Sequence, residues 1–375
     1  MAGGPVRVLH LADLHLGWTP RFLGSRAGER QRERDGLLTR AVDWVLTESA
    51  ADMVVIAGDL FETHRPEPGL LGRVVADLAR LVEAGVAVVT VPGNHDEITY
   101  HDSVYREYGL RWPGLLVTSP IAAHAGTLSV RGVPIHIYGL AYTGGVTRTP
   151  VEEFPRLHVP GLHVAVFHGS LGWNAGDRSL PLPEDALAAA SYDYVALGHI
   201  HQHVVRTLGN GLAVYPGAVE GKGFDDPGVG FFTVAVLGDG QARLERKPAG
   251  SRPVRTVELD VSACRDETDV EGRIRELGDS SAIVRVRLVG ASPARLAADE
   301  LADRLRSCFY HLDIVDETTV LDEAAFDGLA AEPTVRGQFV RRMKAAIEQA
   351  KNPDERQMLV LALRRGMAAL GERTR

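Results

Sequence analysis

Five short motifs hold most of the side chains with which this sequence could do chemistry. They are Asp13-Leu14-His15, Gly58-Asp59, Gly93-Asn94-His95-Asp96, His168 and Gly198-His199-Ile200-His201. Together they offer carboxylates, imidazoles and one amide, and none of them contains a cysteine. Such nitrogen and oxygen ligands suit Mn²⁺, Fe or Zn²⁺ rather than a metal that selects thiolates. The motifs therefore predict a site for two divalent metal ions.

A pair of divalent ions suits the hydrolysis of phosphate esters. The reaction brings an oxygen nucleophile to an already anionic phosphorus, so the site must supply positive charge and deprotonate a water near neutral pH. Two metal ions roughly 3.5–4 Å apart do both. Asp59 is the natural bridge because a carboxylate has two oxygens to offer. Asp13 and His15 lie two residues apart and could reach one ion together with Asp59.

The remaining ligands and a proton donor complete the predicted site. His199 and His201 repeat the two-residue spacing and could each serve a different ion. Asn94 offers a neutral oxygen that adds no negative charge, and His168 would complete the coordination of that ion.

His95 is adjacent to a ligand but is not needed as one. An imidazole titrates near neutral pH and can protonate a departing alkoxide, so we predict His95 as the general acid. Asp96 could fix the tautomer of that ring by accepting its other N–H.

Apolar runs precede the motifs and predict the strands that position them. The runs are rich in β-branched residues, as buried strands are, and cover 6–11, 53–56, 86–91, 163–167 and 194–197. Apolar residues at intervals of three and four predict helices around 37–46 and 70–81, so the chain begins β-α-β-α-β. Ligands of an open α/β sheet bind outside the carboxyl ends of its strands. We therefore expect all five motifs at one edge of a sheet.

Each motif alone has a simpler explanation. Asp59 could cap the helix that follows, and Gly93-Asn94 could form a turn. Five strand ends together favour the metal site. Surface or core roles are expected for the histidines outside this setting, which are His64, His101, His124, His136, His158, His163, His203 and His311.

In this order the motifs resemble the signature of calcineurin-like metallophosphoesterases. Further features resemble one branch, the SbcD and meiotic-recombination DNA repair nucleases, which act with an SbcC-type ATPase. These features are the segments 8–17, 58–61, 198–201, 215–220 and 230–232. Glu62 departs from the branch, in which many relatives carry His or Asp after the phenylalanine.

The resemblance has implications for the site and for the substrate. It implies that one metal ion is held by Asp13, His15, Asp59 and His201, and the other by Asp59, Asn94, His168 and His199. It also implies a catalytic role for His95, Mn²⁺ as the activating metal and DNA as the substrate.

Length and composition describe an ordinary globular protein. The 375 residues suggest two or three domains, and 45% are hydrophobic and 24% charged. The two cysteines argue against an extracellular disulfide scaffold. The first residues lack a signal-peptide pattern, and no run reaches the roughly 18 apolar residues of a membrane span. We expect a cytoplasmic protein that does not enter a membrane.

Three domains are predicted within an α/β fold class. Residues 1–248 would form the catalytic domain, a two-sheet β-sandwich flanked by helices as in calcineurin-like metallophosphoesterases. A hairpin over 230–246, with Gly238-Asp239-Gly240 at its turn, would finish the second sheet. Alternating strands and helices, including a helix over 293–308, predict a small α/β domain at 253–320. The resemblance implies a cap that helps to hold DNA; a homodimer-forming or merely stabilising appendage is the alternative.

Residues 333–375 predict a C-terminal helical hairpin. Apolar residues recur there on both sides of Asn352-Pro353, which is typical of a capped helix start. The segment has ten Lys and Arg against four Asp and Glu, and the whole chain has a net charge of −8, so the remainder carries −14. In the resembling nucleases a helical tail docks on the ATPase coiled coil. The alternative is a hairpin that packs on its own domain.

We predict an Mn²⁺-dependent DNA exonuclease or endonuclease that acts in DNA repair with an SbcC-type ATPase. The acidic remainder does not indicate a broad DNA groove. A small-molecule phosphodiesterase or phosphatase, acting on cyclic nucleotides or nucleotide pyrophosphates, is therefore the main alternative. A non-catalytic scaffold for an ATPase is the other, although the ligand set is complete. Arginines that could line the rim of the site, or form a solvated face, are Arg21, Arg26, Arg30, Arg32 and Arg34.

Overall fold

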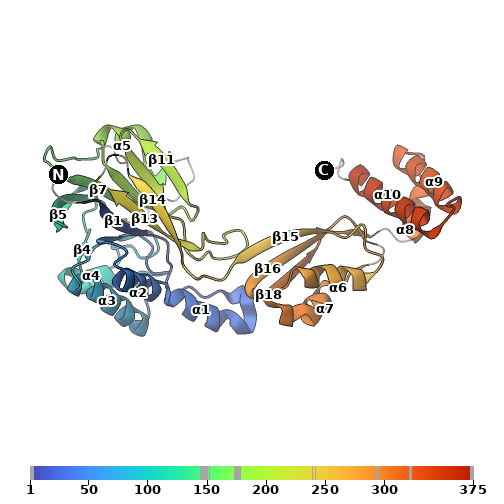
Figure 1. Cartoon of the computed structure of the whole chain (residues 1–375), viewed down its shortest axis with the longest axis horizontal. Helices are drawn as coiled ribbons and strands as arrows, with labels where there is room; N and C mark the ends of the chain where they lie inside the picture. Colours follow the sequence, from blue (N-terminus) through green and yellow to red (C-terminus); the bar gives the residue numbers. More distant parts are fainter. Residues whose placement is uncertain are drawn as a thin grey trace. The chain divides into compact units, whose positions relative to one another are not determined.

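The chain divides into two compact units, residues 1–251 and 252–375 (Figure 1). The computed structural model describes residues 4–143, 151, 153–172, 179–238, 240, 242–292, 295–320 and 323–371. Among these residues, no helix is long and apolar enough to cross a membrane.

The first sheet of the first unit contains the predicted β-α-β-α-β segment. Its strands, in spatial order, are β14 (Arg243–Pro248), β13 (Phe231–Leu237), β1 (Val6–Leu11), β2 (Met53–Ala57), β3 (Ala87–Val91) and β4 (Leu115–Leu116). Strands β1, β2 and β3 are parallel, and the connections between them contain helices α2 (Leu37–Glu48) and α3 (Pro68–Glu83). Before α2 lie a 3₁₀ helix, Arg21–Arg26, and α1 (Ala27–Asp35).

The second sheet contains the other two motif-bearing strands. Its order is β11 (Val204–Leu208), β12 (Gly211–Tyr215), β10 (Tyr194–Gly198), β7 (Leu162–His168), β6 (Val133–Gly139) and β5 (Ala123–Val130). Shorter elements are α4 (Val104–Tyr108), a 3₁₀ turn at Gly109–Arg111, β8 (Ser170–Leu171), β9 (Pro181–Leu182) and α5 (Glu184–Ala190).

Two expectations about the sheets were wrong. The five motifs leave strands of two sheets rather than one, because the antiparallel pair β5–β6 begins a new sheet before β7. The predicted hairpin forms as β13 and β14, but β13 pairs with β1 and so extends the first sheet instead of finishing the second. Residues 239 and 241 of its turn lie outside the described residues.

The two sheets face each other and helices cover their outer sides, which confirms the predicted sandwich. Strand β1 illustrates the layers, because successive side chains of a strand point to opposite faces. Val8 packs in the core between the sheets with Val55 and Val164. Leu9 packs on the other side, in the core that helices α2 and α3 share with the first sheet.

The second unit begins with a three-stranded parallel sheet. Its order is β15 (Val254–Asp260), β16 (Asp279–Val289) and β18 (Phe309–Asp316). It packs against α6 (Glu267–Glu276) and α7 (Ala298–Leu305), while β17 (Ala291–Ser292) pairs with β19 (Thr319–Val320). The predicted helix over 293–308 is shorter than expected, and a 3₁₀ turn at Arg306–Cys308 follows it; residues 293 and 294 are not described.

Three helices follow, one more than predicted. They are α8 (Glu323–Ala331), α9 (Val335–Glu348) and α10 (Pro353–Gly371). Asn352 caps α10, since its side-chain oxygen accepts a hydrogen bond of 2.8 Å from the backbone N–H of Glu355. Val340 and Leu363 pack in a small core to which α8 contributes Phe326, so α8 belongs to this helical group.

Candidate metal centre

The five motifs meet where strands of both sheets end. Asp13 follows β1, Asp59 follows β2, Asn94 follows β3, His168 ends β7 and His199 follows β10. All seven side chains predicted as ligands have hydrogen bonds or ion pairs within this group, and Asp13, His15, Asp59 and His168 are almost fully buried.

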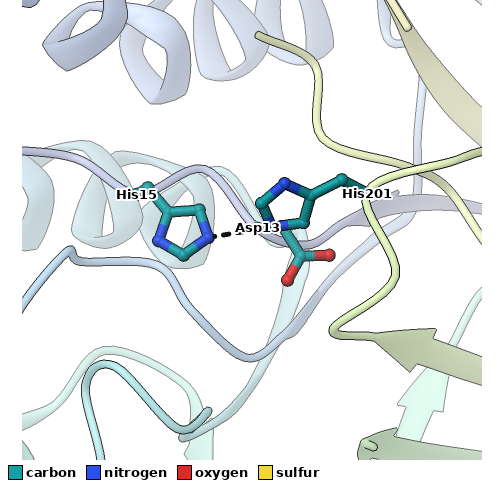
Figure 2. Close-up of side chains that lie close together, drawn as sticks. All are labelled: Asp13, His15 and His201. Carbon is teal, nitrogen blue, oxygen red and sulfur yellow. Dashed lines mark hydrogen bonds between the residues drawn. The ribbon is translucent and has the colours of Figure 1, made fainter. Parts of the chain in front are cut away.

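Asp13, His15 and His201 form the first cluster. Their ligand atoms lie within 4.8 Å of one another. Figure 2 shows the two imidazole rings approaching each other, and the distance between His15 Nε2 and His201 Nε2 is 3.1 Å. The Asp13 carboxylate accepts a hydrogen bond of 2.9 Å from the backbone N–H of His199. Two ring nitrogens and a carboxylate oxygen converging in this way can hold one divalent cation.

Asn94, His168 and His199 form a second cluster around one oxygen. Asn94 Oδ1 lies 2.9 Å from His168 Nε2 and 3.0 Å from His199 Nδ1. Asp13, Asp59 and His168 also bring ligand atoms within 4.8 Å of one another. The amide, the two imidazoles and the shared carboxylate supply the oxygen and nitrogen ligands that a second ion of the same kind requires.

Asp59 lies between the two clusters. Its Oδ2 is 3.6 Å from His15 Nε2 and 3.4 Å from His168 Nε2. Its Oδ1 accepts a hydrogen bond of 2.9 Å from the backbone N–H of His95. One carboxylate thus reaches an imidazole of each cluster, which is the geometry that a ligand shared by two ions needs.

The backbone at the site is strained. Asp13, His15, Asp59 and His199 all have positive φ angles, of 54°, 47°, 49° and 97°. This region is uncommon for residues other than glycine, and strain of this kind gathers at functional sites. Gly93 is required for a related reason, since a Cβ on this residue would lie 2.2 Å from Asp59 Oδ1.

The buried carboxylates of the site need positive charge nearby to be stable. Burial raises the pKa of Asp13 to about 6 and lowers the pKa of His15 to about 4. Burial also opposes the ionisation of Asp59 and His168, but each stabilises the charged form of the other. The pKa of Asp59 is therefore lowered, and the pKa of His168 is raised to about 9. Buried carboxylates need compensating cations, and a pair of divalent ions fits this donor set.

His95 lies at the edge of the site, with 36% of its side chain exposed. Its Nδ1 is 3.2 Å from the backbone oxygen of Glu62, and its ring packs edge-on against His15. The role expected for Asp96 was wrong. The Asp96 oxygens instead accept hydrogen bonds from the backbone N–H groups of Gly93 and Phe61 and from the Tyr105 hydroxyl. The Asp96 side chain is buried beneath the loop that follows β3, and it holds the backbone of that loop. It does not reach the His95 ring, because adjacent residues of the loop point in different directions.

Three residues next to the site were not predicted as part of it. Glu62 Oε2 lies 2.9 Å from His15 Nδ1, Lys222 Nζ lies 2.7 Å from the same Glu62 oxygen, and Asp226 Oδ2 lies 2.7 Å from His201 Nδ1. In the sequence, Glu62 differs from the family pattern, but nothing there connects it with His15. Lys222 and Asp226 follow the segment 215–220, but no spacing connects them with the ligands.

The sequence is similar to those of known metallophosphoesterases. The calcineurin-like phosphoesterase family matches residues 6–203. The DNA double-strand break repair protein Mre11 of Methanopyrus kandleri is 30% identical, over 93% of this chain and 80% of the relative. The protein of the same name from Aeropyrum pernix is 27% identical, over 68% of this chain and 64% of the relative. The uncharacterized metallophosphoesterase YhaO of Bacillus subtilis is 26% identical, over 76% of this chain and 72% of the relative.

Proposed function

Because the chain belongs to the calcineurin-like phosphoesterase family, we propose that it is a metal-dependent phosphodiesterase that cleaves DNA with two divalent ions. The position of Asp59 carries the proposal. One oxygen of this carboxylate lies within 3.6 Å of an imidazole nitrogen from each of two ligand clusters. Two ions held in this way supply positive charge to the phosphate and lower the pKa of a water.

The proposed ligand sets share Asp59. One ion is assigned to Asp13, His15, Asp59 and His201, and the other to Asp59, Asn94, His168 and His199. The distances within each cluster support the assignment. Mn²⁺ is the proposed metal because oxygen and imidazole ligands accommodate it and no thiolate competes in the set.

His95 is the proposed general acid. The backbone oxygen of Glu62 can accept its Nδ1–H, since the two atoms are 3.2 Å apart. Nε2 is then the atom that carries the proton to the departing sugar oxygen. The partial exposure of the ring allows water to reprotonate it after each turnover. Asp96 acts indirectly in this scheme, by holding the backbone of the loop that carries Asn94 and His95.

DNA is the proposed substrate because a relative that matches 93% of this chain is a DNA double-strand break repair protein. In the test, purified protein is incubated with Mn²⁺ and one substrate at a time. The substrates are labelled single-stranded DNA, labelled double-stranded DNA, bis-p-nitrophenyl phosphate and cyclic nucleotides. Cleavage of DNA by the wild type but not by Asp59→Asn, made in parallel, would exclude a contaminating nuclease. Turnover of the small substrates alone, even with an ATPase partner present, would overturn the DNA assignment.

We further propose that helices α9 and α10 dock on a coiled-coil ATPase of the SbcC type. Both helices carry large apolar side chains that are exposed, namely Val335 at 77% and Met358 at 70%. Exposed apolar side chains such as these can pack against a coiled coil, and the basic residues of both helices would favour an acidic one.

The docking proposal is tested by copurification of the full chain with the ATPase. Val335→Glu with Met358→Glu should abolish the complex, because it would bury two new charges. The matched control is Leu110→Glu, since Leu110 is also an exposed apolar residue but lies in the first unit. Copurification of the double variant at the wild-type level would contradict docking.

A further inference from the structure

The loop formed by residues 220–228 contacts the surroundings of the first ligand cluster, that of Asp13, His15 and His201. Asp226 Oδ2 lies 2.7 Å from His201 Nδ1, and Lys222 Nζ lies 2.7 Å from Glu62 Oε2. That Glu62 oxygen is in turn 2.9 Å from His15 Nδ1. In both His15 and His201, Nδ1 therefore lies next to a carboxylate oxygen, and Nε2 points toward the ring of the other histidine.

The second cluster is supported differently. His168 Nδ1 lies 2.9 Å from the backbone oxygen of Ala57, the last residue of β2. His199 Nδ1 lies beside Asn94, within the cluster itself. The ring of His168 is thus oriented by a main-chain carbonyl of β2, whereas the rings of the first cluster are oriented by carboxylate side chains.

Three arginines, of which Arg30 and Arg34 are buried, fix the loop to the first helices. Arg30 in α1 and Arg40 in α2 contact the two carboxylate oxygens of Glu220 at 2.9 and 3.2 Å. Arg34 in α1 donates to the backbone oxygens of Gly221 and Leu14, and so joins the loop to the Asp13-Leu14-His15 motif. Arg30 and Arg34 are 4% and 2% exposed, so these two neither line a rim nor form a solvated face.

The loop is also closed on itself. Gly223 and Asp226 exchange backbone hydrogen bonds of 3.1 and 3.3 Å, and Asp226 Oδ2 accepts a further bond of 2.9 Å from the backbone N–H of Lys222. These hydrogen bonds hold the Asp226 carboxylate in place independently of its contact with His201.

Glu62 supports His15 rather than acting as a ligand itself. His15, Glu62 and His95 bring ligand atoms within 4.8 Å of one another, so a cation between them is conceivable. However, the ammonium of Lys222 already lies on the Glu62 oxygen that faces His15. A divalent ion there would be repelled by the ammonium, whereas an imidazole N–H is compatible with it.

We infer that Glu62 and Asp226 are positioning residues that set the affinity of the metal position at Asp13, His15 and His201, and of that position only. The inference rests on the proposed two-metal function. A carboxylate that accepts the second N–H of a ligating histidine fixes the ring and increases its basicity. Loss of such a partner typically weakens metal binding by about 10–100-fold.

The experiment titrates Mn²⁺ into the full chain by calorimetry, for the wild type, Glu62→Gln and Asp226→Asn. The control is Asp225→Asn, which removes the neighbouring, exposed carboxylate of the same loop. We expect two binding events in the wild type and in the control. Each of the other variants should keep one wild-type affinity and lose about 10–100-fold in the other. At Mn²⁺ concentrations that saturate the wild type, their electron paramagnetic resonance spectra should change from a coupled pair to a single ion.

Other outcomes would contradict either the positioning role of Glu62 and Asp226 or the proposed two-metal function. Two unchanged affinities in both variants, or equal weakening of both events, would overturn the positioning role. A lower melting temperature of both variants in metal-free buffer would assign the effect to folding of the loop and also overturn it. Fewer than two events in the wild type would instead overturn the proposed function.

Discussion

Replacing Gly93 by alanine should disable the site through a single methyl group. The new Cβ would lie 2.2 Å from Asp59 Oδ1 and 2.4 Å from the Asp59 backbone nitrogen, whereas ordinary contacts begin at 3.4 Å. The loop and Asp59 must therefore separate by about 1 Å, and a displacement of this size can cost about 10²-fold in rate. Rotation of the Asp59 side chain cannot relieve the strain, because the second contact is with backbone. Overpacking of this kind also destabilises a fold by about 1–3 kcal/mol.

The assay measures kcat/KM on bis-p-nitrophenyl phosphate, Mn²⁺ affinity by calorimetry and the free energy of unfolding in urea. The matched control is Gly72→Ala, because a Cβ at this exposed position of α3 would meet no atom within 4 Å. It should keep full activity and gain about 0.5–1 kcal/mol in stability, since alanine suits a helix better than glycine. Wild-type rate and Mn²⁺ affinity in Gly93→Ala would refute the argument from close approach.

Three further predictions concern catalysis, acidity and metal. His95→Ala should leave both Mn²⁺ affinities intact and slow hydrolysis by about 10²–10⁴-fold, and an unchanged rate would remove its role as acid. Burial lowers the pKa of His10 to about 3, so the folded unit lacks a proton that the unfolded chain binds below pH 6.5. Stability should then be complete above pH 6.5 and fall as the pH decreases toward 3, by up to about 1.4 kcal/mol per pH unit. His10→Gln should flatten this slope in urea unfolding, and equal slopes would contradict the assignment. Mn²⁺ at about 100 times its Kd should raise the free energy of unfolding by about 2.7 kcal/mol per ion, and chelation should reverse the gain; an unchanged melting curve would speak against binding.

Local sequence predicts the elements of the first unit better than their assembly. The strands at β1, β2 and β3 and the helices between them follow from apolar runs and amphipathic spacing, because local burial produces those patterns. Runs 163–167 and 194–197 have the same character, yet they belong to the other sheet. Sheet membership depends on pairing between distant residues, such as Val8 with Ala235, which no local pattern records.

In the candidate site, the metal ligands can be predicted from the sequence, but the residues that support them cannot. The motif residues were identifiable because metal ligands are few in kind and lie at strand ends. Glu62, Lys222 and Asp226 are ordinary charged residues, and Lys222 meets Glu62 across 160 positions of the chain. Asp96 was assigned to the wrong partner because sequence adjacency to His95 does not give the direction of a side chain. The positive φ angle of Asp59 is likewise a result of tertiary packing.

Anomalous X-ray diffraction at the manganese absorption edge, from crystals grown with Mn²⁺, would show whether Asp59 is shared by two metal ions. We expect two peaks roughly 3.5–4 Å apart, with the Asp59 carboxylate between them. One ion would be coordinated by His15 and His201, and the other by His168 and Asn94. A single peak, or a pair that does not share Asp59, would contradict this expectation.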